Sequence, residues 1–80
     1  MEYPKTFPFK KLRTLLEHRN IIWDASKGKG SHGCFVGPDA NGNIQSYPIP
    51  HKQQKQTQKC YLKGLCARFG IDPADLFASS

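Results

Sequence analysis

The sequence predicts a small α+β fold in which two amphipathic helices cover one face of a three-stranded antiparallel sheet. Two apolar stripes with helical spacing lie near the two ends of the chain, and three short segments rich in β-branched and aromatic residues lie between them. A dense turn signal, GPDANGN at 37–43, separates the last two segments and indicates a hairpin. The predicted order is helix, three strands, helix, with one sheet face left open for a functional site.

The first helix is expected to follow Thr6, whose hydroxyl can cap it, and to end near residues 19–20. Residues 21–23, Ile-Ile-Trp, then form a short strand candidate. The helix buries a stripe made of Phe9, Leu12, Leu15 and Leu16. Lys10, Lys11, Arg13, Glu17 and His18 fall largely outside this stripe.

The second and third strands are expected at 31–36 and 44–49, after a loop rich in glycine and lysine at 26–30. Pro48 and Pro50 lack backbone donors, so the third strand should lie at an edge or stop there. Alternation in the second strand separates one set of side chains, His32, Cys34 and Val36, from its neighbours. If Phe35 is the core residue, His32 faces away from the helices; if Cys34 and Val36 are, it lies near the core rim.

The C-terminal quarter is expected to contain the second helix and one short turn. Residues 51–59 are polar and basic and show no period, and the predicted order of helix, three strands and helix includes no element between the third strand and the second helix. The helix opens near Lys59 and ends at Gly70, and Asp72-Pro73 then begins a terminal turn. The buried residues are expected to be Leu62, Leu65, Cys66 and Phe69 in the helix, with Leu76 and Phe77 in the turn.

Length and charge limit the possible functions. Eighty residues allow a single domain, 1–80, with a modest core and a shallow site, so no large cofactor is expected. Twelve Lys and Arg against six Asp and Glu give a formal charge of +6, which favours an acidic partner: nucleic acid, anionic lipid or an acidic protein. Without a long apolar run or a secretory signal, the chain is expected to be cytoplasmic and not membrane-bound.

The cysteines and carboxylates do not indicate a metal site. Three cysteines without CxxC spacing support neither zinc nor a disulfide framework, so ordinary reduced thiols are expected. The six carboxylates are scattered without a paired motif, which disfavours a metallonuclease, although Asp24 and Asp39 could still approach each other across the sheet. The expectation is a protein with neither metal nor cofactor.

One ordered set of motifs extends over roughly residues 9–71. It consists of Gly30-Ser31-His32 followed by Phe35, a strand ending Ile49-Pro50-His51, and a helix running from Lys59 and Tyr61-Leu62-Lys63 to Phe69-Gly70-Ile71. This set resembles the HicA (YcfA-like) toxin family. The resemblance implies a fold similar to the double-stranded RNA-binding domain, cleavage of mRNA, neutralisation by a HicB-type antitoxin, and catalysis by His32. The chain departs from many members at Gly33, where they carry a second histidine, and at Ile22, where they carry a glycine.

The chemistry is consistent with this reading. RNA supplies its own nucleophile, the 2′-hydroxyl, so no metal is required, and imidazole exchanges protons near neutral pH as a general acid or base. His32 can therefore serve in either role, while Lys27 and Lys29 hold the phosphate. Backbone N–H groups around Gly30 and Ser31 can donate to the developing charge.

Further residues are candidates for RNA contact, and each also has a purely structural explanation. Lys52, Lys55 and Lys59 can follow a phosphate backbone, although a solvated loop explains them nearly as well. His51 either contacts RNA or terminates the strand, and termination is favoured. Trp23 and Tyr47 can stack on unpaired bases, but Trp23 is favoured as a core residue.

Three functions follow. The first is a metal-independent endoribonuclease toxin with His32 as acid or base, RNA as substrate and a HicB-type antitoxin as partner. The alternative is a non-catalytic module that binds structured RNA by shape. In a third reading, the basic surface only docks an acidic protein.

Overall fold

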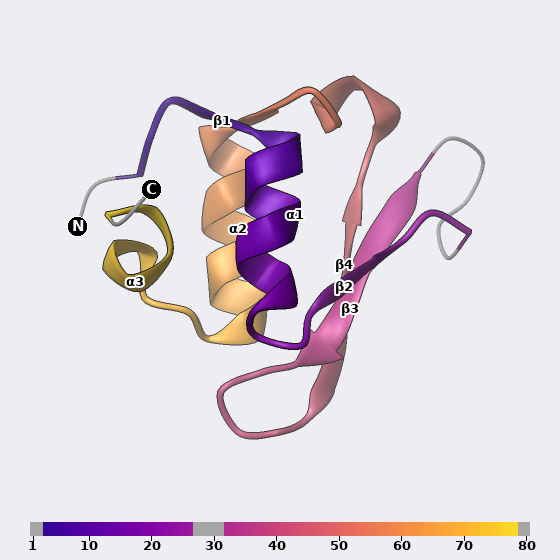
Figure 1. The fold of residues 1–80 in the computed structure, drawn as a ribbon, viewed down its shortest axis with the longest axis vertical. Coiled ribbons are helices and arrows are strands. Elements are labelled where there is room, and N and C mark those ends of the chain that lie inside the picture. The colour runs from indigo at the N-terminus through magenta and orange to yellow at the C-terminus, as the bar shows by residue number, and fades with distance from the viewer. Residues whose placement is uncertain (1–2, 27–31, 79–80) are drawn as a thin grey trace.

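The computed structural model describes residues 3–26 and 32–78 of the chain (Figure 1). Predicted residues Lys27, Lys29, Gly30 and Ser31 lie outside this described part. In chain order the elements are β1 (Thr6–Pro8), α1 (Phe9–Glu17), β2 (Ile22–Asp24), β3 (Gly33–Pro38), β4 (Ile44–Ile49), the 3₁₀ helix η1 (His51–Gln53), β5 (Gln56–Gln58), α2 (Lys59–Phe69) and α3 (Pro73–Phe77).

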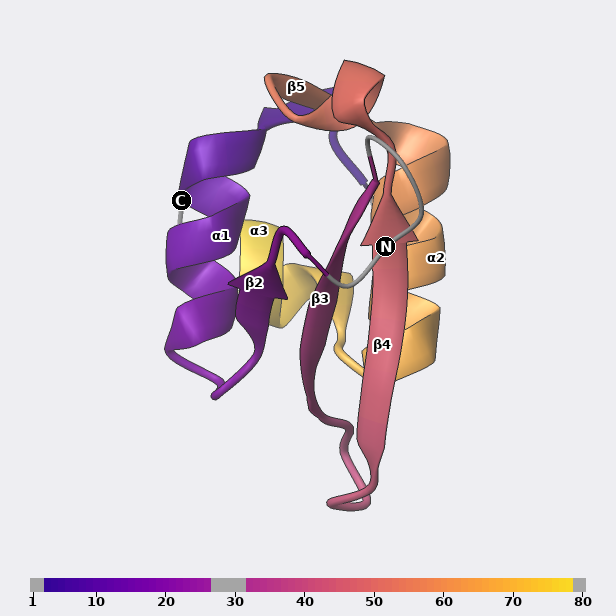
Figure 2. The same cartoon turned by 90° about the vertical axis from the view of Figure 1, so that its right-hand side faces the viewer.

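The predicted three-stranded antiparallel sheet is confirmed. Its strand order is β2-β3-β4, and Phe35 in β3 pairs with Trp23 on one side and Tyr47 on the other. Both longer helices, α1 and α2, lie on one face of this sheet, and the opposite face is turned toward the viewer in Figure 2. β4 has the predicted bounds and forms one edge, as the prolines at 48 and 50 indicated.

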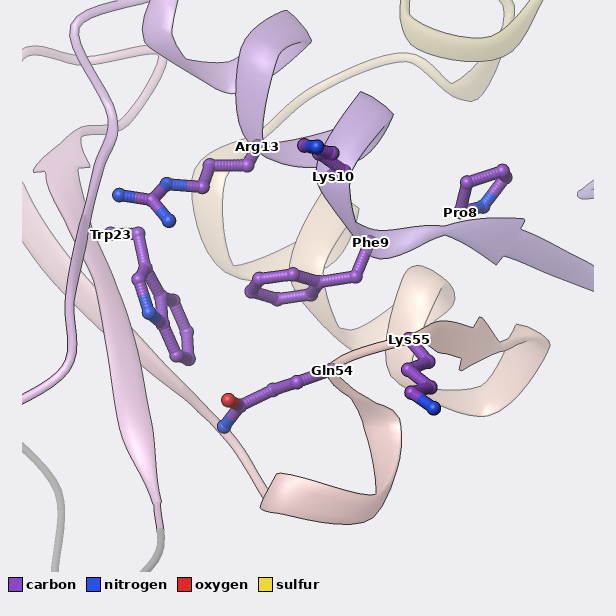
Figure 3. A pocket seen from close by; sticks show the side chains of 7 residues that line it. All are labelled: Pro8, Phe9, Lys10, Arg13, Trp23, Gln54 and Lys55. Atoms are coloured by element: carbon purple, nitrogen blue, oxygen red, sulfur yellow. The ribbon is translucent and has the colours of Figure 1, made fainter.

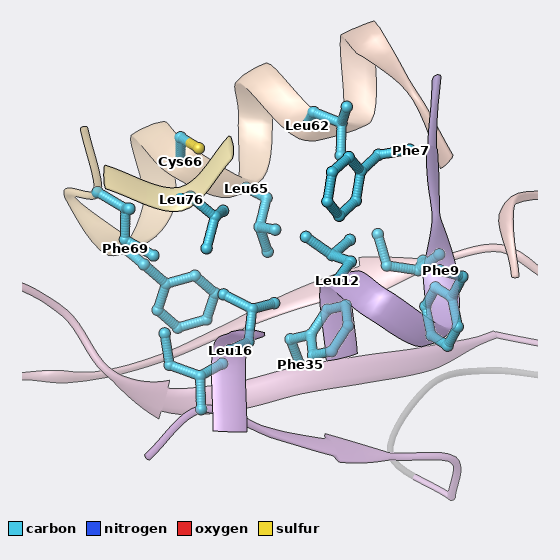
Figure 4. Packing of buried hydrophobic residues seen from close by; sticks show 13 residues of the cluster. Phe7, Phe9, Leu12, Leu16, Phe35, Leu62, Leu65, Cys66, Phe69 and Leu76 are labelled. Atoms are coloured by element: carbon cyan, nitrogen blue, oxygen red, sulfur yellow. The ribbon is translucent and has the colours of Figure 1, made fainter. Parts of the chain in front are cut away.

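The core lies between the sheet and the helices (Figure 4). Both helices bury leucines spaced three or four residues apart, because one face of each helix turns toward the sheet. The buried cluster consists of Phe7, Phe9, Leu12, Leu16, Ile21, Phe35, Ile49, Leu62, Leu65, Cys66, Phe69, Ile71 and Leu76. It contains every predicted core residue of the two helices except Leu15, which packs against it half-buried.

A second, two-stranded sheet was not predicted. β1 pairs antiparallel with β5, with Phe7 opposite Thr57, and both side chains are buried. The segment 51–59, which showed no period, contains the 3₁₀ helix η1 and the strand β5, so the predicted order of helix, three strands and helix was incomplete. The Thr6 cap was also wrong, because Thr6 belongs to β1 and Pro8 precedes the helix without a side-chain cap.

The boundaries of α1 and β3 differ from the predicted ones by two or three residues, and those of β2 differ by one. Asn20 has a φ of 64°, a left-handed conformation that ends the helical path, and the Ile21 N–H donates to the Leu16 carbonyl at 3.0 Å. Ile21 then enters the core, so β2 begins one residue later. β3 continues through Gly37 because that position packs against residues 20–21, where a Cβ would lie 2.6 Å from the Asn20 carbonyl oxygen.

The C-terminal elements agree with the predictions. Gly70 has a φ of 64° at the end of α2, and Asp72 caps α3 by accepting a hydrogen bond from the Ala74 N–H at 2.9 Å. Leu76 is buried, and the Phe77 ring lies edge-on to Phe7 at 5.0 Å between centroids. No helix in the described ranges has the length and apolar character needed to cross a membrane.

Candidate functional site

His32 is exposed and immediately precedes β3. Phe35 is fully buried in the cluster under the helices, whereas Cys34, although buried, does not belong to that cluster. Alternation along the strand then places His32 on the same face as Cys34, away from the helices. Of the two alternatives, Phe35 is the residue in the helix-side cluster, so the alternation of β3, extended by one residue, favours the open sheet face for His32.

The pairing of β3 with β4 brings His32 to the same end of the sheet as His51. Gly33, the first residue of β3, pairs with Ile49, the last residue of β4, so the residues just outside both strands are neighbours at this end. His51 opens η1 and is exposed, as are Lys52 and Lys55. A shallow pocket of about 370 Å³ is lined by His51, Lys52, Gln54 and Lys55. The structure therefore brings three of the predicted RNA-contacting residues together.

A second open pocket, of about 480 Å³, adjoins the first and shares Gln54 and Lys55 with it. It lies between the start of α1, the strand β2 and the segment after η1 (Figure 3). Its lining combines two aromatic rings with three cations and comprises Pro8, Phe9, Lys10, Arg13, Trp23, Gln54 and Lys55. In Figure 3 the Arg13 side chain extends toward Trp23. We call this lining the aromatic pocket.

Trp23 has two roles that the sequence presented as alternatives. Its ring packs against the core, with centroids 4.9 Å from both Phe9 and Phe35, and it also lines the aromatic pocket. Gly33 lies directly against the ring, because a Cβ on Gly33 would come within 2.7 Å of the Trp23 Cη2 atom. The residue that follows His32 is thus held by the tryptophan.

Three of the predicted residues that the structure describes, His32, Lys59 and Tyr47, line neither pocket. Lys59 begins α2 and is exposed, but it lines neither pocket, and its backbone N–H donates to the Lys5 carbonyl at 3.0 Å. Tyr47 lies half-buried on the helix side of the sheet, where its ring packs against Gly64 of α2. It is therefore not presented for stacking on an open surface.

Sequence reasoning missed Lys10, Arg13 and Gln54. Lys10 and Arg13 are three residues apart in α1, so they project from one side of the helix beside its apolar stripe. The sequence shows this spacing, but nothing in the sequence indicates that this side of α1 faces Gln54. Their meeting depends on the β1–β5 pairing, which connects residues about fifty positions apart.

The titratable groups with shifted pKa values lie outside these two pockets. Burial raises the pKa of the Cys66 thiol to about 11 and also raises the pKa of Tyr47. The Gln45 side-chain amide, followed by backbone N–H groups of the turn, lowers the pKa of Asp39. Within residues 3–26 and 32–78, no group of three or more His, Cys, Asp or Glu side chains is placed to hold a metal ion.

Comparison with known proteins gives no assignment: no family model, curated protein or solved structure matches this chain.

Proposed function

We propose that the protein is a metal-independent endoribonuclease of the HicA-like toxin class, with His32 as its general acid or base. The observation that carries the proposal is the position of His32, which is exposed and, through the pairing of Gly33 with Ile49, lies at the end of the sheet that carries two cation-lined pockets. His32 itself lines neither pocket. Lys10 and Arg13 come from α1, and Lys52 and Lys55 follow β4. An imidazole beside a concentration of positive charge suits a polyanionic substrate.

The proposed reaction uses the substrate's own hydroxyl. The His32 imidazole takes the proton of the 2′-hydroxyl, the 2′-oxygen bonds to phosphorus, and the bond from phosphorus to the 5′-oxygen breaks. The imidazolium then returns that proton to the leaving oxygen, directly or through water. The products are a 2′,3′-cyclic phosphate and a 5′-hydroxyl. Nearby lysine and arginine side chains stabilise the negative charge on the phosphorane.

Within the described residues, no hydrogen bond or ion pair holds the His32 side chain. The proposal therefore assigns both proton transfers to a single residue, and the expected turnover is slow compared with enzymes that use a paired acid and base. Slow cleavage is sufficient for a protein whose effect is growth arrest.

The fold supports the same class. The order α1-β2-β3-β4-α2, with both helices on one face, fits the architecture similar to the double-stranded RNA-binding domain that the resemblance implies. The proposed HicB-type antitoxin would cover the open sheet face together with His32. Ile22 and Ile44, which are 57% and 69% exposed, lie on that face and would be buried by such a partner.

The deciding experiment is digestion of RNA in EDTA by the wild type and by His32→Ala. We expect the substitution to lower the cleavage rate by about 10²- to 10⁴-fold, the usual contribution of a general acid or base. Product analysis should find 2′,3′-cyclic phosphate ends. His18→Ala is the matched control, because His18 is also exposed but lies at the far end of α1.

Circular dichroism should first show that both variants are folded. Equal cleavage by wild type and His32→Ala would rule out the proposed role of this histidine. Binding of RNA without cleavage by any of the three proteins would instead favour the non-catalytic RNA-binding module.

A further inference from the structure

We infer that the aromatic pocket binds one unpaired nucleotide of single-stranded RNA, with the base against Trp23 and its phosphate among Lys10, Arg13 and Lys55. This inference rests on the proposed function, because it takes RNA as the substrate. It adds a specificity site for an unpaired nucleotide, which neither His32 nor a general basic surface supplies. The volume of about 480 Å³ lies in the range of small-molecule sites.

Trp23 is held in place before any ligand arrives. Gly33 lies against its six-membered ring, Phe9 meets it at 81° and Phe35 at 62°, with both centroids 4.9 Å away. The ring remains only half-buried and lines the pocket (Figure 3). A fixed, partly exposed indole offers stacking surface with little loss of side-chain freedom on binding.

Gln54 supplies a polar group in the same pocket. Its Nε2 donates to the Ile49 carbonyl at 3.1 Å, which fixes the orientation of the amide. Among the described residues, the Oε1 atom has no hydrogen-bond partner. In Figure 3 the amide end of Gln54 points to the side of the pocket occupied by Trp23. An oriented acceptor beside an aromatic ring suits the N–H edge of a nucleobase.

The cations complete the chemistry of a nucleotide. Lys10 and Arg13 belong to the first turns of α1, and Lys55 lies across the pocket from them. The Arg13 side chain is 48% exposed and its nitrogen lies 3.9 Å from Glu17, a weak surface pair that leaves its remaining donors for a phosphate. Aromatic surface bordered by such cations is the arrangement that single-strand binders use.

The pocket lies at the same end of the sheet as His32, although His32 does not line it. Trp23 packs against Gly33 on the helix side of the sheet, and Gly33 follows His32, which alternation places on the opposite face. An RNA strand that reaches both Trp23 and His32 would therefore pass around this end of the sheet.

The test uses Trp23 fluorescence, because Trp23 is the only tryptophan in the chain. The protein is the full chain carrying His32→Ala, so that bound RNA stays intact. A short single-stranded oligoribonucleotide is titrated, with fluorescence anisotropy of the labelled RNA reporting binding and Trp23 emission reporting the pocket. A matching oligonucleotide with abasic sites, an RNA duplex, and adenosine monophosphate alone are the comparison ligands.

We expect saturable quenching of Trp23 by the single strand, and affinity weaker by about fivefold or more for the abasic strand because stacking is lost. Arg13→Ala should weaken single-strand binding more than Lys63→Ala, which removes an exposed cation from α2 outside the pocket. Both positions are on helix surfaces, so both variants should fold.

Binding of RNA with no change in Trp23 emission would overturn the inference, as would equal affinity for the abasic strand or no binding at all. Adenosine monophosphate binding as tightly as the strand would show a free-nucleotide site and overturn the assignment to RNA. These outcomes are separable from failure of the proposed function, because cleavage that depends on His32 is measured independently of Trp23 emission.

Discussion

Gly33 joins His32 to the aromatic pocket, because it follows His32 in the chain and packs against the Trp23 ring. The Trp23 ring occupies the volume in which a side chain at position 33 would lie. Any larger side chain at position 33 would require the ring to move. The glycine and the tryptophan are therefore two parts of one local arrangement.

Replacing Gly33 with alanine should destabilise the protein and displace Trp23. The added methyl would overlap ring atoms that Phe9 and Phe35 already hold, and overpacking of this kind costs about 1–3 kcal/mol. Urea unfolding measures the loss of stability, and the emission maximum of the single tryptophan reports the displacement.

Gly42→Ala provides the control for this prediction. Gly42 has a φ of 84° in the hairpin turn and no neighbour within 4 Å of its Cβ position, so alanine there strains only the backbone. It should lower stability without altering Trp23 emission. If Gly33→Ala changes neither stability nor Trp23 emission, Gly33 does not pack tightly against the Trp23 ring.

At the scale of elements, the small β1–β5 sheet positions the pocket. The Phe9 N–H donates to the Lys55 carbonyl at 2.9 Å, which joins the start of α1 to the segment after η1. Phe7 and Thr57, the central pair of this sheet, are both buried. The two halves of the aromatic pocket, α1 and residues 54–55, are thereby held together.

Thr57→Val should destabilise the protein by about 1–2 kcal/mol, because it removes a hydrogen bond from a buried site. The Thr57 hydroxyl donates to the Gln53 carbonyl at 2.9 Å, and Thr57 has no exposed surface. Valine keeps the shape of the side chain and leaves that carbonyl without this donor. The free energy of unfolding, measured in urea, gives the cost.

Thr14→Val is a closely matched comparison for that measurement. Its hydroxyl also donates to a carbonyl four residues earlier, that of Lys10, but at 3.2 Å on the exposed surface of α1. Water can replace this bond, so the change should stay within about 0.5 kcal/mol. Equal effects at positions 14 and 57 would contradict the role given to burial.

The elements that sequence patterns predicted are those with local signals. The leucine stripes of α1 and α2, the turn before β4 and the Asp72 cap each depend on residues close together in the chain. β1 and β5 are three residues long and are defined by pairing with each other, for which local periodicity gives no signal. Arg13 and Gln54 line the same pocket only because β1 pairs with β5, so local sequence patterns could not predict that they lie together. His51, Lys52 and Lys55 lie within five residues of one another in the chain, so their grouping could be predicted.

At the scale of the whole molecule, four of the twelve lysines and arginines lie together at one end of the sheet. Lys10, Arg13, Lys52 and Lys55 line the two adjoining pockets there. Asp39 lies in the hairpin at the opposite end, where the Gln45 amide and the backbone N–H groups of Asn41 and Asn43 hold its carboxylate. The cations that line the two pockets give this end of the sheet a local concentration of positive charge, which favours approach of an anion there.

This distribution predicts the salt dependence of RNA binding. A single strand releases counterions with a slope of about −0.7 in log affinity against log salt for each phosphate neutralised. If each of the four pocket cations, Lys10, Arg13, Lys52 and Lys55, contacts one phosphate, the slope should be about −3. Lys52→Ala should reduce its magnitude by about 0.7, whereas Lys63→Ala should leave it nearly unchanged, because Lys63 lies outside both pockets.

Titrations of the His32→Ala protein at several salt concentrations measure these slopes. Equal reductions for Lys52→Ala and Lys63→Ala would show that RNA responds to net charge alone, and a slope near zero would favour a protein partner for this surface.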